Sequence, residues 1–150
     1  MTMTETDLIE GLATLFRANV NEPLASCEVH TWPQIDYEGA AGYVELSFVS
    51  GREVFEAIGN QAADEVSLRI YAELKFADTQ ANRQSIETLC AQIRFILRTA
   101  ANRRMSTDSG LATLNRDIRW EYGFNADGQV IKRYCTIWVT YRLPQGTSAP

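Results

Sequence analysis

Residues 78–101, DTQANRQSIETLCAQIRFILRTAA, decide the fold of this chain. Asp78 or Thr79 can cap a helix there, and Arg98 lies toward the end, where a cation suits the negative pole of the helix dipole. Phe95 falls on the opposite side, about 180° from the apolar stripe. The stretch predicts a long helix with one buried face and an aromatic side chain outside. The stripe has the three- and four-residue spacing of an amphipathic helix and consists of Ile86, Leu89, Cys90, Ile93, Leu97 and Ala100.

A shorter helix is predicted near the N-terminus. Thr4-Glu5-Thr6-Asp7 supplies a capping oxygen and acidic first-turn residues, and the helix should end near Asn19. Its apolar face consists of Leu8, Ile9, Leu12, Leu15 and Phe16.

Alternating apolar and polar side chains predict strands at 27–32, 43–50 and 65–74. Residues 52–58 are expected to return as another strand after a turn at Ser50-Gly51. The clearest strand is 65–74, which has one apolar and one polar face, as in an antiparallel sheet covered by helices on one side. Its apolar face consists of Val66, Leu68, Ile70, Ala72 and Leu74.

The C-terminal part is predicted to form a β-hairpin of residues 115–124 and 129–143, with its turn at 125–128. Pairing Phe124 with Gln129 places Glu121 opposite Lys132. One face then holds the polar set Asp117, Arg119, Glu121, Lys132, Tyr134, Thr136 and Trp138. The other holds the largely apolar set Ile118, Trp120, Tyr122, Ile131, Cys135, Ile137, Val139 and Tyr141.

These elements predict an α+β fold: an antiparallel sheet of about four to five strands, with the N-terminal helix and the long helix packed on one face. One domain over residues 1–150 is expected, with flexible ends at 1–5 and 144–150. The predicted shared core consists of Leu68, Ile70, Leu89, Ile93, Ile137 and Val139.

Charge is distributed unevenly along the chain. The net charge is −5, but residues 1–75 carry 13 acidic and 4 basic side chains, whereas residues 76–150 carry 6 acidic and 10 basic ones. This split fits either a solvated surface or electrostatic complementarity between neighbouring copies. The net negative charge disfavours nucleic-acid binding as the main role, because phosphate contacts dominate such affinity.

No catalytic or metal-binding motif stands out, and we expect neither enzymatic activity nor a cofactor. The only histidine, His30, forms at best a weak dyad with Cys27, since strand residues three apart face opposite sides. Cys90 and Cys135 fall on predicted core faces as inert thiols, and three widely spaced cysteines fit a reducing compartment. No apolar run or basic leader predicts a membrane span or a secretory signal.

Aromatic side chains on the polar faces are candidates for protein contacts, where aromatics are enriched. Phe95, Tyr134 and Trp138 are the candidate anchors, with Arg119 and Lys132 as charged neighbours on the hairpin.

The order of elements resembles that of tail terminator proteins of long-tailed bacteriophages, the tail-completion family. The resemblance covers most of residues 8–143 and rests on element order, the strand at 66–74, the helix after it and the closing strand at 136–143, with its T-x-x-V-T-Y pattern. It implies a virion structural protein that forms a homo-oligomeric ring, typically a hexamer. Such a ring caps the tail tube, stops its polymerisation and meets the neck or connector proteins of the head.

Genome DNA would pass through that ring without specific binding, and the ring would be assembled in the bacterial cytoplasm. The family brings no catalytic residues to this chain. A head–tail neck protein is the alternative, and a small binding domain is the third possibility. The split charge suits a head-to-tail ring, in which one patch meets a different patch on the next copy.

Overall fold

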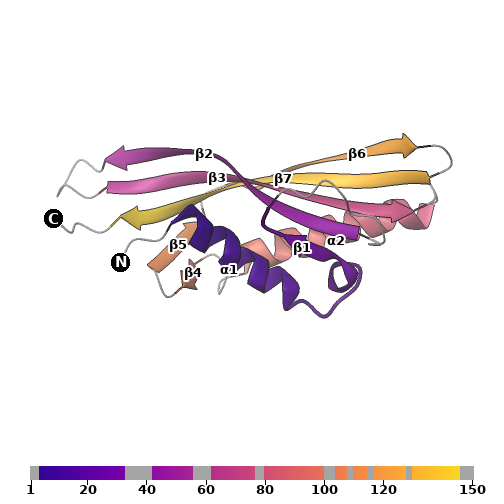
Figure 1. Ribbon diagram of the computed structural model, residues 1–150, viewed down its shortest axis with the longest axis horizontal. Helices are drawn as coiled ribbons and strands as arrows, with labels where there is room; N and C mark the ends of the chain where they lie inside the picture. The colour runs from indigo at the N-terminus through magenta and orange to yellow at the C-terminus, as the bar shows by residue number, and fades with distance from the viewer. Residues whose placement is uncertain are drawn as a thin grey trace.

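The chain folds into two α-helices that cover one face of a twisted sheet (Figure 1). The computed structural model describes residues 4–32, 42–55, 62–76, 80–99, 104–107, 110–114, 117–127 and 130–145. Its elements are α1 (Glu5–Arg17), the 3-10 turn η1 (Leu24–Ser26), β1 (Glu28–His30), β2 (Gly42–Phe55), β3 (Ala62–Phe76), α2 (Gln80–Arg98), β4 (Arg104–Thr107), β5 (Gly110–Leu114), β6 (Arg119–Asp127) and β7 (Val130–Gln145).

The sheet joins seven strands in the order β1-β2-β3-β7-β5-β4, and β6 also pairs with β7. All pairings are antiparallel except β1 with β2, which is parallel. The five strands β1, β2, β3, β7 and β6 form the main sheet, and the β4–β5 hairpin joins the far end of β7 through Thr113 and Leu114. The predicted α+β class is confirmed.

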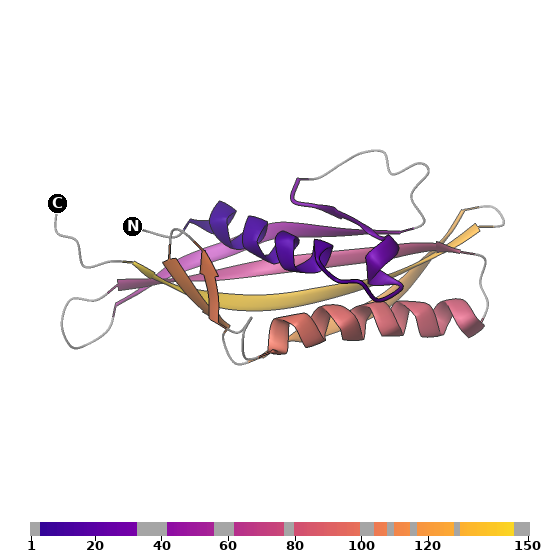
Figure 2. The same ribbon diagram turned by 90° about the horizontal axis from the view of Figure 1, so that it is seen from below.

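Both helices lie on the same side of the sheet, as Figure 2 shows from below. α1 packs against β1 and β2 and reaches β4, whereas α2 packs against β3 and β7. Apolar stripes on the helices and the apolar face of β3 explain this arrangement, because each must be removed from water. All six predicted core residues are buried, none more than 2% exposed.

Polar contacts fix the two helices in place. Thr4 and Asp7 form a reciprocal capping box at the start of α1. The Arg17 guanidinium donates to the Val29 carbonyl of β1 at 2.8 Å. On α2, the Gln92 amide accepts from the Leu24 backbone and donates to the Glu22 carbonyl, which joins this helix to η1.

The long helix spans Gln80–Arg98, so it ends before the predicted residue 101, and the first helix ends at Arg17, close to the predicted Asn19. The predicted cap residues Asp78 and Thr79, and the last stripe residue Ala100, lie outside the described residues, as do 1–3 and 146–150. Where the ends of the chain are described, Thr4 caps α1, Glu5 is its first residue, and β7 continues to Gln145.

Several strand predictions are wrong in detail. The expected turn at Ser50-Gly51 is a β-bulge between Phe48 and Ser50, so 42–55 is one long strand. β4 and β5 form a short hairpin in a part of the chain for which no strand was predicted. The predicted strand at 27–32 narrows to Glu28–His30, and the one at 115–124 begins only at Arg119.

The hairpin register is also corrected. Asp127 pairs with Val130, so β6 runs past the expected turn and Glu121 faces Thr136, not Lys132. The four-residue displacement along β7 is even, and an even displacement leaves each side chain on its predicted face. The turn residues 125–127 continue the ladder, since backbone pairing with a long β7 is available to them.

Candidate interaction surfaces

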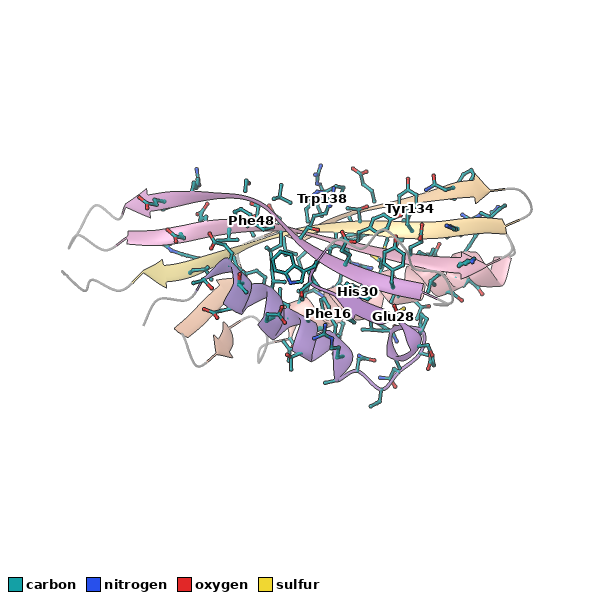
Figure 3. The ribbon with its side chains drawn as sticks, in the orientation of Figure 1. Phe16, Glu28, His30, Phe48, Tyr134 and Trp138 are labelled. Carbon is teal, nitrogen blue, oxygen red and sulfur yellow. The ribbon has the colours of Figure 1, made fainter. Side chains whose placement is uncertain are left out.

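The face of the sheet turned away from the helices carries a row of tyrosines. Tyr43 of β2, Tyr71 of β3 and Tyr134 of β7 lie side by side, with ring centroids 5.9 Å and 5.4 Å apart. Burial raises the pKa of the Tyr71 hydroxyl, and Glu73, which accepts its hydrogen bond, raises it further. No helix covers this row in the described part of the chain (Figure 3). We call this surface the open face.

Four of the five predicted contact residues lie on the hairpin strands of the open face. The Arg119 guanidinium lies 4.2 Å above the ring of Trp138, its direct cross-strand partner. Lys132 is two residues before Tyr134 on β7, on the same face. Figure 3 shows Tyr134 and Trp138 on the side of the sheet opposite Phe16 of α1.

Phe95, the fifth predicted residue, is placed elsewhere. Its side chain is 62% exposed on α2, as the helix pattern predicts, and α2 lies against the other face of the sheet. The structure therefore brings Arg119 and Trp138 into contact but separates Phe95 from the hairpin set.

Tyr134 also covers a glycine. Gly123 of β6 is its cross-strand partner, and a Cβ atom at this position would overlap the Tyr134 ring. The ring is thus held between Tyr71 and the bare backbone of β6. Tyr134 and Trp138 are both half-buried, so part of their apolar area is already used within the chain.

A second aromatic surface was not predicted. Trp120, Tyr122 and Phe124 project from β6 on the helix side of the sheet and are 40%, 46% and 61% exposed. We call these three residues the aromatic ridge. The predicted apolar face of the hairpin includes Trp120 and Tyr122, and Phe124 lies on the same face by the same alternation. Their exposure was not predicted: β6 pairs with β7 alone among the described strands, and α2 packs against β7 and β3.

Arg94 of α2 covers part of the ridge. Its guanidinium carbon lies 3.8 Å from the centre of the Trp120 ring, a cation–π geometry. Its Nε atom is buried and finds no hydrogen-bond acceptor in the described residues. No carboxylate of the described chain lies within ion-pair distance of Arg94 either.

An apolar pocket opens at the opposite edge of the sheet. It has a volume of about 440 Å³ and lies between the first half of α1 and the middle of β2. Ile9, Trp32, Leu46 and Phe48 supply its apolar walls, and Trp32 and Phe48 are 72% and 47% exposed. Glu5 and Glu10 stand at its rim, with no partner cation among the described residues.

The cysteines show different environments. Cys27 donates to the Pro23 carbonyl, and burial, with a contribution from the nearby Glu22 charge, raises the pKa of its thiol to about 11. A thiol with that pKa is protonated at neutral pH and is a poor nucleophile. His30 contacts the Glu28 carboxylate at 3.0 Å.

Cys90 and Cys135 are fully buried, as predicted, and form a pair between α2 and β7. The hydrogen bond between them lowers the pKa of Cys90 and raises that of Cys135, and Arg94 also favours the Cys90 thiolate. Burial and the contact with Cys90 raise the pKa of the neighbouring Tyr122 to about 12.

Within the described residues, no group of three or more His, Cys, Asp or Glu side chains is arranged to hold a metal ion. None of the described helices has the length and apolarity needed to cross a membrane. Comparison of the chain with protein-family models finds no match, and comparison with curated proteins finds none either.

Proposed function

We propose that this chain is a structural virion protein of the tail terminator type, which forms a homo-oligomeric ring on the phage tail tube. The ring, a hexamer in the family it resembles, would end polymerisation of the tube and join the tail to the neck or connector proteins of the head. Its site of action would be the head–tail junction of the virion, after assembly in the host cytoplasm.

The observation that carries this proposal is the lateral separation of charge. The described residues from α1 to β2 carry seven acidic and two basic side chains, whereas α2, β6 and β7 carry seven basic and three acidic ones. Because α1, β1 and β2 form one side of the molecule and α2, β7 and β6 the other, the split along the sequence becomes a split in space.

Opposite sides with opposite excess charge favour head-to-tail association between copies. Such a contact joins unlike surfaces and repeats until it closes, so a ring is its bounded outcome. Complementary charge steers the encounter and sets orientation, while buried apolar side chains supply most of the affinity.

The test is the solution mass and shape of the purified protein. Size-exclusion chromatography with light scattering should give a single mass that is a whole-number multiple of the 16.9 kDa chain. Negative-stain images should show rings with a central channel. Adding the protein to growing tubes of the tail-tube protein from the same phage should stop their elongation. Rings that leave elongation unchanged would favour a neck protein instead.

A small binding domain is the second candidate, and the 440 Å³ apolar pocket is the observation that favours it. A protein that stays monomeric at every accessible concentration, and whose pocket binds a small apolar fluorophore, would support this reading over the ring.

A further inference from the structure

We propose that neighbouring copies join edge to edge, with the aromatic ridge around Trp120 of one copy packed against the apolar pocket between α1 and β2 of the next. This inference rests on the proposed ring and deepens it by naming the two surfaces in contact and the residues at their centre.

The ladder registers place Trp120, the first residue of the ridge along β6, level with the pocket. Trp120 pairs with Ile137, which pairs with Ile70, which in turn pairs with Leu46 of the pocket. Directly opposed residues point to the same face of a sheet. Trp120 and Leu46 therefore lie at one level, on the helix side, at opposite edges of the molecule.

The strand directions also suit lateral repetition. β2 is antiparallel to β3, β3 to β7 and β7 to β6, so β6 and β2 run in opposite directions. A neighbour displaced sideways would bring its β2 edge to β6 in the antiparallel sense. Among the described residues β1 pairs with β2 only at residues 43–45, so the level of Leu46 is the first one that β1 leaves uncovered.

Both edges are open in the described part of the chain. β6 pairs with β7 alone, and β2 beyond Glu45 pairs only with β3. Unpaired edges with apolar flanks invite addition of another strand. The two open stretches share their height around Trp120 and Arg119, which are level with Leu46 and Ser47, so the contact with a second copy of this chain centres on Trp120.

The chemistry of the two surfaces is complementary. The ridge exposes indole and phenyl rings next to the Arg94 guanidinium, and the pocket offers apolar walls below the carboxylates of Glu5 and Glu10. None of these three charged groups has an ion-pair partner among the described residues. In an edge-to-edge contact the Arg94 cation of one copy would face the acidic rim of the next.

Three single substitutions test the contact in the full-length protein. Trp120→Glu removes the ridge residue that is level with the pocket, Phe48→Glu places a charge at the pocket wall, and Val20→Glu is the matched control. Val20 is 86% exposed and lies in neither surface. The dissociation constant of the assembly should rise at least about 30-fold in the first two variants, as expected for loss of a central aromatic contact. Val20→Glu should assemble with the dissociation constant of the parent.

Mixing the two defective variants gives the sharpest readout. Each retains one intact edge, so an equimolar mixture should form a 1:1 dimer and nothing larger in light scattering or sedimentation velocity.

Glu10→Arg, an exposed substitution on α1, should weaken assembly several-fold without touching the core, and thermal unfolding of each variant checks that it is folded.

The outcomes separate this inference from the proposed function. If the parent forms rings and both defective variants still do, or if the mixture gives no dimer, the contact is wrong while the ring proposal stands. Rings lost in Phe95→Asp or Trp138→Asp but kept in Trp120→Glu would also overturn it. Open chains that depend on Trp120 would support the contact and contradict the ring. A monomeric parent would overturn both.

Discussion

Ile93 shows what a single side chain contributes to this fold. It lies in the middle of the α2 stripe and is fully buried against the sheet. Ile93→Ala should lower the free energy of unfolding by about 2–5 kcal/mol, since it removes buried methyl groups and leaves a cavity. Urea denaturation with an unchanged slope measures this loss. The control Thr88→Ala, on the exposed side of the helix, should stay within about 0.5 kcal/mol of the parent, and equal values for both variants would show that the helix register is wrong.

The buried hydroxyl of Tyr141 lowers the stability of the folded chain. Its hydroxyl is fully buried without a hydrogen-bond partner in the described chain, and an unsatisfied buried polar group costs about 1–3 kcal/mol. Tyr141→Phe should therefore leave stability unchanged or raise it by about 1 kcal/mol in thermal or urea unfolding. A fall in the free energy of unfolding of more than about 1 kcal/mol would instead reveal an acceptor for the hydroxyl.

The same substitution has a pH signature. Burial raises the pKa of Tyr141, so the folded state holds the phenolic proton more tightly than the unfolded state does. The stability from this group is complete below the ordinary tyrosine pKa of about 10 and is lost as the pH rises above it. Between about pH 10 and 12, unfolding free energy should fall more steeply in the parent than in Tyr141→Phe.

At the scale of elements, patterns of side chains predicted faces better than they predicted pairings. The alternation of β3 and the stripe of α2 depend on burial, which leaves a strong trace in sequence, and both are confirmed. The turn of the last hairpin and the bulge after Phe48 depend on backbone pairing with a distant strand, which composition does not encode. The ridge was missed because the exposure of Trp120 depends on how far α2 extends below the sheet.

Gly123 offers a test of the observed hairpin register. In most strands Gly→Ala is stabilising or neutral, because glycine loses more conformational entropy on folding. Here the new methyl group would overlap the Tyr134 ring, so Gly123→Ala should cost about 1–3 kcal/mol. In a Tyr134→Ala background the same change should become neutral or favourable, and the double-mutant cycle measures the coupling. Additive effects would place Tyr134 elsewhere.

At the scale of the whole molecule, the two halves of the chain become two sides of one layer. The acidic half supplies α1, β1 and β2, and the basic half supplies α2, β6 and β7, with β3 between them. The sequence alone does not decide whether this uneven charge belongs to a solvated surface or to a contact between copies. The fold gives the charge separation a direction. It points across the strands, from the β2 edge of the described sheet to the β6 edge.

Salt should reveal whether that direction matters for assembly. In the proposed contact, charges on the two sides would meet near the surface, where the screening length is about 8–10 Å at 0.1–0.15 M salt. Exposed pairs contribute only about 0–1 kcal/mol each, so raising NaCl from low to high concentration should weaken assembly several-fold and slow association more than it speeds dissociation. Sedimentation and stopped-flow light scattering measure the two effects.

Sodium sulfate at concentrations that favour apolar burial should restore part of the assembly, because the ridge and pocket would supply the larger share of the contact. Assembly that strengthens steadily with NaCl would instead indicate that like charges meet at the interface, and that the acidic and basic sides do not face one another.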